Sequence, residues 1–483
     1  MTSPASPAHP APHPEARGRA GIDAAVAQLH ERFGDQLSRS PSILDIHGRD
    51  ESWHGTLPPD AVFFPQSTDE VADAVRICAA NRCPVIPWGA GTSVEGHTAP
   101  LHGGVTFDLS GLDRILEINA DDLDCRVGAG VKRKQLERAL YDLGLFFPID
   151  PGADATFGGM ASTRASGTTA VRYGTLRDAV LGLTVVLADG QVIRTGTRAR
   201  KSSAGYDLTR LFVGAEGTLG ILTEVQLRLW GRPDQIVAAV CPFSGLEGAV
   251  HAATEVVQLA IPVARMELLD AAMVDAVNRY SDRSDPVQPT LFFELHGSPG
   301  AVAEQVDMLH EITASHGGGD FAWSKDQAER EALWHARHHA LYASLALRPG
   351  CKAFSTDVCV PISRLADVLP ASQADARAEG LLAPIVGHVG DGNFHMILIF
   401  DPDDADERAT VERVNGRLVE RALAAGGTST GEHGVGFGKI PWVEREHGDA
   451  VDVMRRIRAA LDPDGILNPG KVFRASAGAP DRA

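Results

Sequence analysis

The sequence predicts an α+β protein made of more than one domain. Its 483 residues exceed what one compact core of usual size accommodates. Segments with helical spacing of apolar residues alternate with short runs typical of strands. Three loops rich in glycine and other small residues fall in the first half, and the composition changes near Arg232-Pro233. We therefore expect an N-terminal domain with a large ligand cleft, followed by a second α+β domain.

The bulk composition argues against several classes of protein. Hydrophobic residues make up 44% and charged residues 22%, which are ordinary globular values. The formal net charge of −18 argues against a nucleic-acid partner. Six cysteines form no CxxC pair, which indicates a reducing compartment and no disulfide framework. No apolar run approaches the ~20 residues of a membrane helix. We expect a cytoplasmic protein, with peripheral contact with the inner membrane left open.

The first elements are expected to be a helix over 22–37 and then a β-α-β unit. The strands of the unit are expected at 61–64 and 84–87. Its helix begins at a capping box of Ser67 and Glu70. One stripe of this helix has the spacing of a buried face: Val71, Ala74, Val75 and Cys78. The second strand leads into a loop, residues 88–97, whose glycines expose backbone N–H groups suited to a phosphate.

Two more loops of small residues follow in the first half, within 150–178 and 214–220. Such residues allow close approach of a bulky ligand and donate hydrogen bonds from hydroxyl or backbone groups. Three loops of this kind favour one large cofactor cleft over three ordinary turns. Strands are expected at 105–109, 124–127 and 221–229, and a helix at 133–143 with Leu136, Ala139, Leu140 and Leu143 buried. Asp189-Gly190 is expected to be the two-residue turn of a hairpin.

The second half predicts another α+β domain. Its strands are expected at 236–240, 290–296, 353–360 and 395–400, and its helices at 246–259, 301–316, 326–346, 411–425 and 451–461. His388 and His395 lie seven residues apart before the last strand. An odd spacing sends side chains to opposite faces of a straight strand, so these histidines meet only if Gly390-Asp391-Gly392 turns the chain.

A third ligand for a metal site is expected from GGTSTGEHGVGFGK, where Glu432 and His433 lie between glycines. His388, His395 and Glu432 would form a His₂Glu site with positions open to water or substrate, as catalytic metal sites require. His433 would then be available to move protons. Ordinary structural histidines and a charged loop residue remain the alternative at this point, because only the fold can bring these residues together.

Several stretches in the same order resemble a known family. They are 87–97, 150–178, 214–224, HVGDGNFH at 388–395, GEHGVG at 431–436 and ILNPGKVF at 466–473. These stretches resemble FAD-linked oxidoreductases of the vanillyl-alcohol oxidase type. Members of that type share an FAD-binding domain that is called PCMH-type. Within that type they are most similar to the group of D-lactate dehydrogenase (cytochrome) and the glycolate oxidase FAD subunit. D-2-hydroxyglutarate dehydrogenase is a more distant member, and the resemblance spans residues 55–475.

The resemblance implies a two-subdomain FAD-binding domain, followed by an α+β cap domain with an antiparallel sheet and the metal site. The expected parts are a disordered tail at 1–20, a helical segment at 21–57, the FAD-binding domain at 58–232, the substrate or cap domain at 233–440, a C-terminal helix with a return to the FAD site at 441–475, and a disordered tail at 476–483.

The resemblance also implies which residues bind FAD. Backbone groups of one loop would hold the pyrophosphate: Pro87, Trp88, Gly89, Ala90, Gly91, Thr92 and Ser93. The rest of the cofactor would be lined by Asp150, Pro151, Gly152, Thr156, Gly158, Gly159, Ala165, Ser166, Gly167, Arg172, Tyr173, Glu216, Gly220 and Ile221, with Asn468 near the isoalloxazine. Gly91-Thr92-Ser93 stands where covalent members carry a linking histidine, so we expect non-covalent FAD.

The resemblance assigns a divalent metal, with zinc expected, to His388, His395 and Glu432. His433 would act as the base, and Arg337 would bind the substrate carboxylate as a bidentate fork. A metal lowers the pKa of the substrate hydroxyl, the base removes its proton, and hydride leaves C2 for flavin N5. Electrons would then pass to an external acceptor, which is a cytochrome, a quinone or another flavoprotein.

The substrate is expected to be a small D-2-hydroxy acid, with D-lactate oxidised to pyruvate. Ser355 stands where hydroxyglutarate enzymes carry a lysine, which disfavours a second carboxylate on the substrate, although Lys352 is close in sequence. The alternatives are a glycolate oxidase FAD subunit, a D-2-hydroxyglutarate dehydrogenase and, more remotely, a non-redox zinc hydrolase. The oligomeric state, including a homodimer, is left open.

Overall fold

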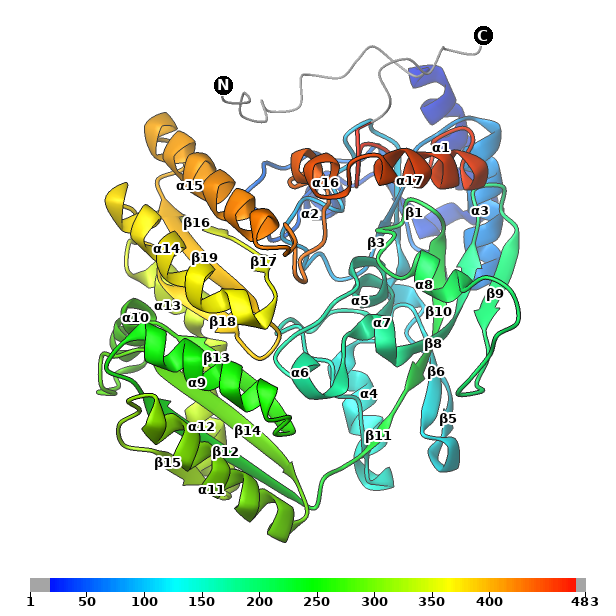
Figure 1. Cartoon of the computed structure of the whole chain (residues 1–483). Helices are drawn as coiled ribbons and strands as arrows, with labels where there is room; N and C mark the ends of the chain where they lie inside the picture. Colours follow the sequence, from blue (N-terminus) through cyan, green and yellow to red (C-terminus); the bar gives the residue numbers. More distant parts are fainter. Residues whose placement is uncertain (1–17, 475–483) are drawn as a thin grey trace. The chain divides into compact units, whose positions relative to one another are not determined.

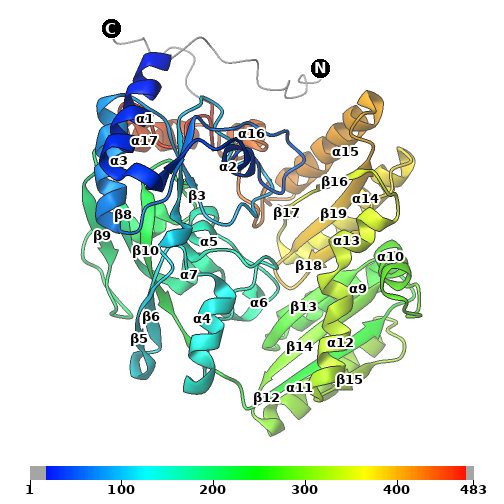
Figure 2. The same cartoon turned by 180° about the vertical axis from the view of Figure 1, so that it is seen from behind.

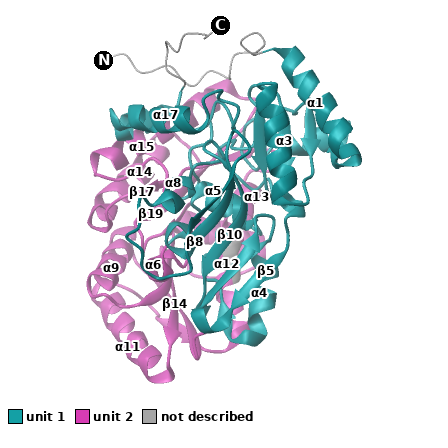
Figure 3. Ribbon diagram, turned by 90° about the vertical axis from the view of Figure 1, so that its right-hand side faces the viewer, with its two compact units in different colours: residues 1–165, 175–231, 432–483 teal, residues 166–174, 232–431 magenta. Residues whose placement is uncertain are grey.

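The computed structural model describes residues 18–474, apart from the side chains of residues 335, 336 and 338. The predicted disordered tails therefore lie almost wholly outside the described residues. The chain divides into two compact units, which Figure 3 shows in two colours. Unit 1 comprises the residues up to 165, residues 175–231 and the residues from 432 on. Unit 2 comprises residues 166–174 and 232–431.

The first sheet of unit 1 confirms the predicted β-α-β arrangement. Its four strands have the order β1-β2-β4-β3. They are β1 (Leu37–Ser38), β2 (Ala61–Phe63), β3 (Val85–Trp88) and β4 (Val105–Asp108). β2 and β3 both run parallel to β4, and helix α3 (Thr68–Ala80) connects them. Helix α1 (Arg19–Phe33) packs beside α3 (Figure 1). The predicted stripe of α3 is buried, and so are Ile22, Ala25, Val26 and Leu29 of α1.

The start of α3 differs in one detail from the predicted capping box. Ser67 Oγ accepts a hydrogen bond from Glu70 N, as expected. The Glu70 carboxylate, however, accepts from Gln66 N at 2.7 Å and from Gln36 Nε2 at 2.8 Å. Only half of the reciprocal box therefore forms, because two neighbouring donors outside the helix bind the carboxylate.

The second sheet of unit 1 is antiparallel and has the order β5-β6-β10-β8-β9. Its strands are β5 (Ile115–Asn119), β6 (Asp124–Gly128), β8 (Val180–Val186), β9 (Val192–Gly196) and β10 (Ile221–Arg228). The predicted hairpin is confirmed, but its loop has three residues, 188–190, because Leu187 N still bonds to Gln191 O. Gly190, with φ of +77°, closes this loop. The edge strand β5 was not predicted, since its residues are mostly half-buried and show no alternation.

Short elements complete unit 1. They are α2 (Pro41–His47), α4 (Arg133–Leu140), β7 (Leu145–Phe146), α5 (Phe157–Thr163), α7 (Leu176–Ala179), α8 (Leu208–Phe212), β11 (Trp230–Gly231), α16 (Ile440–His447) and α17 (Ala450–Leu461). Helix α4 is shorter than predicted, and Ala139 and Leu143 are exposed. A 3₁₀ turn follows it and ends at Gly144 with φ of +66°, which takes Leu143 off the helical face. Leu136 and Leu140 are buried as predicted.

Unit 2 is built on one antiparallel sheet in the order β15-β12-β14-β13-β18-β19-β16, with β17 also paired to β19. The strands are β12 (Gln235–Pro242), β13 (Val263–Leu269), β14 (Thr290–Gly297), β15 (Ala322–Ser324), β16 (Lys352–Ser355), β17 (Val358–Cys359), β18 (Ile385–His388) and β19 (Asn393–Phe400). Every pairing among them is antiparallel. The predicted α+β class and antiparallel second sheet are therefore confirmed.

Helices cover both faces of this sheet. They are α6 (Ala170–Tyr173), α9 (Leu246–Gln258), α10 (Ala271–Ser281), α11 (Pro299–Ser315), α12 (Gln327–His338), α13 (Ala340–Ala346), α14 (Leu365–Ala378) and α15 (Ala405–Ala424). α9, α11, α14 and α15 lie on one face (Figure 1), and α12 and α13 lie on the other (Figure 2). α10 packs with α12 and α13 in one apolar cluster.

Two predicted elements of unit 2 are divided in the structure. The strand expected at 353–360 separates into β16 and β17, although both pair with β19 in one register. At the break Thr356 Oγ1 accepts from Met396 N, so a side chain replaces a backbone acceptor. The helix expected at 326–346 separates into α12 and α13 at His339. β13, β18, α10 and α14 were not predicted. No helix within residues 18–474 has the length and apolarity to cross a membrane.

The hairpin of β18 and β19 brings the two predicted histidines to one face of the sheet. His388 pairs with Asn393, and Val386 pairs with His395. Since residues two apart share a face, His395 lies on the same side as His388. The turn expected from the glycines is therefore confirmed. Gly392 has φ of +80°, and a Cβ on it would lie 2.0 Å from Val360 O.

We expect Gly392→Ala to lower the urea midpoint of unfolding more than Gly426→Ala does. Both glycines have nearly the same positive φ, +80° and +81°, but a Cβ on Gly426 would meet nothing within 4 Å. Left-handed backbone alone costs about 1–2 kcal/mol for an alanine. The backbone clash at Gly392 adds to that cost. Equal midpoints for the two variants would contradict a tightly packed hairpin.

Candidate functional site

The residues singled out from the sequence fall in both units, and each set is described within its own unit. Unit 1 contains Pro87, Trp88, Gly89, Ala90, Gly91, Thr92, Ser93, Asp150, Pro151, Gly152, Thr156, Gly158, Gly159, Ala165, Glu216, Gly220, Ile221, Glu432, His433 and Asn468. Unit 2 contains Ser166, Gly167, Arg172, Tyr173, Arg337, His388 and His395.

The three loops of small residues lie together in unit 1. A Cβ on Gly89 would lie 2.4 Å from Thr156 Oγ1, and a Cβ on Gly217 would lie 2.3 Å from the ring of Pro87. Gly214 N donates to Ala161 O at 2.9 Å. Glycine is required at these contacts because any side chain would force the loops apart. The loops after β3, before α5 and before β10 thus form one continuous lining.

One buried donor in this lining has no partner within residues 18–474. Trp88 Nε1 is inaccessible and makes no hydrogen bond there. A Cβ on Gly91, whose φ is +67°, would lie 2.8 Å from the Trp88 ring. An orphaned N–H beside bare loop backbone needs an acceptor. The residues present therefore fit a cofactor that carries phosphate oxygens.

Other predicted cofactor residues make internal contacts. Asn468 Nδ2 donates to His97 O at 3.1 Å and to Glu216 O at 2.8 Å, so the C-terminal segment is held against the loop that follows β3 and the loop that precedes β10. The Glu216 carboxylate accepts from Val435 N and Gly436 N at 2.7 and 2.8 Å. Both side chains are buried. They hold loops in place, which the sequence motifs alone did not reveal.

Arg172 and Tyr173 form hydrogen bonds to other residues of unit 2. Arg172 Nη1 donates to Pro262 O at 2.7 Å and to His296 O at 2.8 Å. Tyr173 Oη lies 2.7 Å from His296 Nδ1. These contacts attach the short helix α6 to β13 and β14. The segment 166–174 therefore belongs structurally to unit 2, although it lies within the first half of the chain.

Two charged residues of unit 1 escaped the sequence analysis. Glu95 is buried, with Oε1 at 3.1 Å from Lys439 Nζ and 3.7 Å from His433 Nδ1. Burial raises the pKa of Glu95, but the charge of Lys439 and contact with His433 outweigh burial and lower it overall. Lys471 is fully buried and donates to Ala99 O at 2.5 Å. The sequence contains a signal for Glu95, because a charged residue within a loop of small residues needs a partner of opposite charge when the loop is buried.

Charged and imidazole side chains share one face of the unit 2 sheet. The register pairs Arg265 with Glu294, and Glu267 is two residues beyond Arg265 on the same face. β13 also pairs with β18, and continuing that register places Glu267 opposite His388. Arg337 reaches this face from α12. The other face of these strands is apolar, with Met266, Leu268, Phe293 and Leu295 buried.

Glu267 lies at the centre of this polar face. Its Oε1 accepts from His388 Nδ1 at 2.6 Å, and its Oε2 accepts from Arg337 Nε at 2.6 Å. Burial raises the pKa of the Glu267 carboxyl, but the charges of His388 and Arg337 lower it by more. Glu267 is not among the residues predicted from the sequence, although charged residues at alternate positions of an apolar strand, as in VARMELL, are a usable signal.

The arrangement of His388 and His395 fits a divalent metal. Their ring centroids lie 5.4 Å apart, with the rings nearly perpendicular at 84°. His395 Nδ1 lies 2.8 Å from Thr356 O. A carbonyl and the Glu267 carboxylate only accept hydrogen bonds, so Nδ1 carries the proton in both rings and Nε2 keeps its lone pair. Two buried imidazoles whose Nε2 atoms carry the basic lone pair form a suitable partial donor set for a divalent metal.

The chain that leads to Glu432 is fastened beside His395. Thr430 Oγ1 donates to Asp357 Oδ2 at 2.8 Å, and Asn393 Nδ2 donates to Asp357 Oδ1 at 2.9 Å. A Cβ on Gly431 would lie 2.1 Å from Asn393 Nδ2. Unit 2 ends at Gly431, and Glu432 is the next residue of the chain. Glycine at 431 is thus required by the close contact with Asn393.

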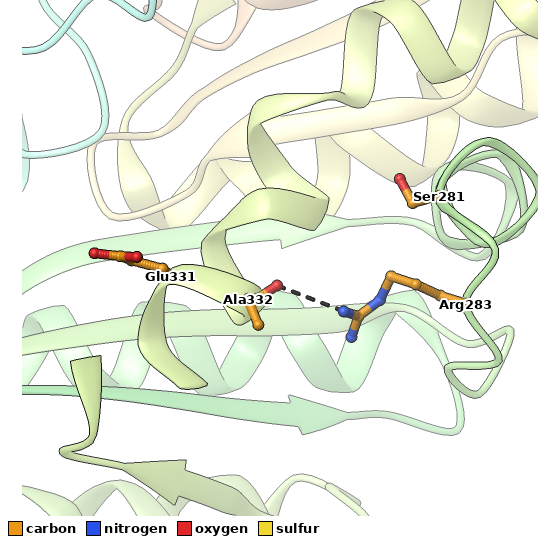
Figure 4. A pocket seen from close by; sticks show the side chains of 4 residues that line it. All are labelled: Ser281, Arg283, Glu331 and Ala332. Atoms are coloured by element: carbon orange, nitrogen blue, oxygen red, sulfur yellow. Dashed lines mark hydrogen bonds between the residues drawn. The ribbon is translucent and has the colours of Figure 1, made fainter. Parts of the chain in front are cut away.

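A surface pocket elsewhere in unit 2 lacks the chemistry expected of an active site. It is lined by Ser281, Arg283, Glu331 and Ala332 (Figure 4). Arg283 donates to both carboxylate oxygens of Asp285, at 2.6 and 2.9 Å. Its charge is therefore already neutralised. No residue predicted from the sequence to bind cofactor, metal or substrate lines this pocket.

Comparison with known proteins identifies two family domains along the chain. Residues 59–196 match the model for an FAD binding domain, and residues 232–472 match the model for the C-terminal domain of FAD linked oxidases. The chain is 49% identical over 459 residues to "Probable D-lactate dehydrogenase, mitochondrial" of Danio rerio, covering 94% of this chain and 92% of that protein. It is 42% identical to "D-lactate dehydrogenase [cytochrome], mitochondrial" of Arabidopsis thaliana, covering 93% and 80%.

A solved structure shows the same fold at low identity. The 4-ethylphenol oxidase from Gulosibacter chungangensis superposes with a TM-score of 0.79 and 20% identity, covering 95% of this chain and 98% of that one. The predicted fold, with an FAD-binding domain of the PCMH type and an α+β domain with an antiparallel sheet, is therefore confirmed.

We expect Lys471→Met to reduce the rise in stability between about pH 7 and pH 10. Burial lowers the pKa of Lys471 to about 7, whereas an unfolded lysine titrates near 10.4. Within this window the unfolded chain binds a proton that the folded chain does not, so stability rises by about 1.4 kcal/mol per pH unit. Urea midpoints at several pH values measure this slope.

The exposed Lys134 supplies the control for that measurement. Lys134→Met should keep the wild-type dependence of the midpoint on pH, because its side chain lies on the surface of α4. An unchanged slope in Lys471→Met would contradict a folded-state amine that is neutral above pH 7.

Proposed function

The chain belongs to the FAD-linked oxidase family as a D-lactate dehydrogenase (cytochrome)-like enzyme, and we propose that it oxidises D-lactate to pyruvate using bound FAD and a divalent metal. The observation that carries the proposal is the polar face of unit 2. There, the buried Glu267 carboxylate accepts hydrogen bonds from His388 and Arg337, and His395 Nδ1 bonds to Thr356 O, so both imidazoles keep the basic lone pair on Nε2. This combination suits a substrate that has a hydroxyl and a carboxylate on adjacent carbons.

The chemistry that bound FAD would supply is acceptance of a hydride from C2 of the substrate. The loop from Pro87 to Ser93 would hold its pyrophosphate, with Trp88 Nε1 as a donor to a cofactor oxygen. The other residues of unit 1 that are predicted to line the cofactor would bind the remainder of FAD. Thr92 has no ring nitrogen to form the covalent link found in other members, so the cofactor would be held by non-covalent contacts.

Arg337 would bind the carboxylate of the substrate. Its Nε is fixed by Glu267, which leaves the two terminal nitrogens of the guanidinium as a planar fork. Such a fork donates two parallel hydrogen bonds to one carboxylate. Arg337 would thus orient the substrate, since the hydroxyl carbon is held at a set distance from the bound carboxylate.

His388, His395 and Glu432 would hold the metal, with zinc as the expected ion. Two neutral imidazoles and one carboxylate leave coordination positions for a substrate. A metal in this place would lower the pKa of the substrate hydroxyl. The support for Glu432 is its place directly after Gly431, where the chain is fastened to Asp357 and Asn393.

His433 would take the hydroxyl proton. Glu95 Oε1 lies on the Nδ1 side of its ring, 3.7 Å away, which favours the tautomer with a proton on Nδ1. Nε2 would then be the basic nitrogen. The His433 side chain is 16% exposed, so its ring is accessible to a small molecule while mostly shielded from water.

A monocarboxylic acid suits the sheet better than a dicarboxylic acid. Ser355 replaces the lysine of hydroxyglutarate enzymes, and Lys352 lies three residues earlier on the same strand β16. An odd separation places Lys352 and Ser355 on opposite faces of β16. Lys352 therefore does not substitute for the missing cation. A cytochrome is the proposed electron acceptor, because the plant relative is named for one.

Anaerobic flavin reduction tests the proposed function. The purified yellow protein is mixed with D-lactate, L-lactate, glycolate or D-2-hydroxyglutarate, and the flavin absorbance is followed. We expect D-lactate to bleach the flavin fastest. After chelator treatment the spectrum should persist while bleaching slows by about 10²-fold or more, since a bound metal ion contributes several kcal/mol. Added zinc should restore the rate.

Each arm of that experiment can fail separately. A fully inert flavin with all four acids would overturn the oxidase function. If another of the four acids bleaches the flavin faster than D-lactate, that acid becomes the proposed substrate. Equal rates before and after removal of the metal would discard the metal site.

We expect His433→Ala to lower kcat by ~10²–10⁴-fold, because a positioned general base contributes about that much. The flavin spectrum and the zinc content should stay at wild-type values. Steady-state turnover with D-lactate and a dye acceptor measures the effect. The control is His447→Ala, at the end of α16, whose side chain is 42% exposed. Near-normal kcat in His433→Ala would remove this residue from the mechanism.

A further inference from the structure

We propose that Glu267 is a positioning residue that couples metal binding to binding of the substrate carboxylate. The inference rests on the proposed function, because His388 and Arg337 take their roles from it. Glu267 itself belongs to none of the sequence motifs. Its place on β13 follows only from the pairing of that strand with β14 and β18.

The geometry gives each carboxylate oxygen one partner. Oε1 accepts from His388 Nδ1, and Oε2 accepts from Arg337 Nε, each at 2.6 Å. Glu267 is 0% exposed, so water does not compete for either oxygen. Charge-assisted hydrogen bonds of this length in a dry environment are strong and directional.

The bond to His388 acts on the proposed metal ligand in two ways. It keeps the proton on Nδ1, which leaves Nε2 as the ligating atom. It also fixes the plane of the ring, and a carboxylate behind an imidazole raises the basicity of the ligand. Without Glu267 the ring would be free to rotate or to change tautomer.

The bond to Arg337 acts on the proposed substrate site. An arginine on a helix has four side-chain torsions, and holding Nε restricts them. The terminal nitrogens are then presented in one orientation. Because the same carboxylate holds both partners, a shift of either one moves the acceptor of the other. Metal and substrate sites are therefore linked through one buried group.

Glu294 supplies a matched control on the same face of the sheet. Its Oε1 lies 2.8 Å from His296 Nε2 and 3.4 Å from Arg265 Nε. Glu294 is 7% exposed and lies on β14, next to β13. It thus has the same chemical surroundings as Glu267, a histidine and an arginine, but neither partner is a proposed ligand. A merely structural role for a buried carboxylate would affect both residues alike.

The test compares Glu267→Gln, Glu267→Asp and Glu294→Gln in the full-length holoprotein. Zinc affinity is measured by competition with a chromogenic chelator, and KM and kcat for D-lactate are measured at saturating zinc. We expect Glu267→Gln to weaken zinc binding about 10–100-fold and to raise KM about tenfold through the loosened arginine. Glu267→Asp keeps the charge but shortens the reach, so it should also weaken zinc binding. Glu294→Gln should keep the wild-type zinc affinity.

The outcomes separate this inference from the proposed function. Wild-type protein that binds no zinc and is indifferent to chelator would refute the metal site itself. Wild-type protein that binds zinc, together with unchanged affinity in Glu267→Gln, would overturn the role of Glu267 alone. Equal losses in the Glu267 and Glu294 variants, or loss of the flavin spectrum in both Glu267 variants, would assign Glu267 to folding and overturn the proposal.

Discussion

Pairing of buried charges is the constraint on which the unit 2 site depends. A carboxylate or guanidinium removed from water is stable only when it is paired and hydrogen-bonded. Glu267, Arg337 and His388 satisfy this condition together, on a sheet whose opposite face is apolar. Removing Glu267 would take away the acceptor of both His388 Nδ1 and Arg337 Nε. The central carboxylate therefore holds together residues that come from a helix and two neighbouring strands.

The main constraint in unit 1 is the close approach of three loops. Its glycines stand where any Cβ would meet Pro87, Thr156 or Trp88. Buried carboxylates then anchor the C-terminal segment, since Glu216 accepts from the backbone of Val435 and Gly436. Within this close packing the Trp88 Nε1–H is buried without an acceptor among the described residues. Such a lining suits a cofactor with many oxygen atoms.

The family assignment and the local chemistry support one another at different levels. Overall likeness to a 4-ethylphenol oxidase at 20% identity shows that the fold persists while the sequence changes. Substrate chemistry must then come from side chains grafted on the fold. We propose that in this chain those side chains are the histidines of the β18–β19 hairpin, Arg337 and the residues that hold them. Each group would address one functional group of a 2-hydroxy acid.

Local patterns in the sequence determined the regular elements, the small-residue loops and the turn between His388 and His395. These features depend on apolar periodicity and on glycine, which act over a few residues. Glu95, Glu267 and Lys471 were decided only by the tertiary structure. Their partners lie far away in the sequence, so a local pattern such as VARMELL marks the charge but not the residues that pair with it. Strand pairing and loop docking select such residues, because burial makes a partner necessary only after the chain has folded.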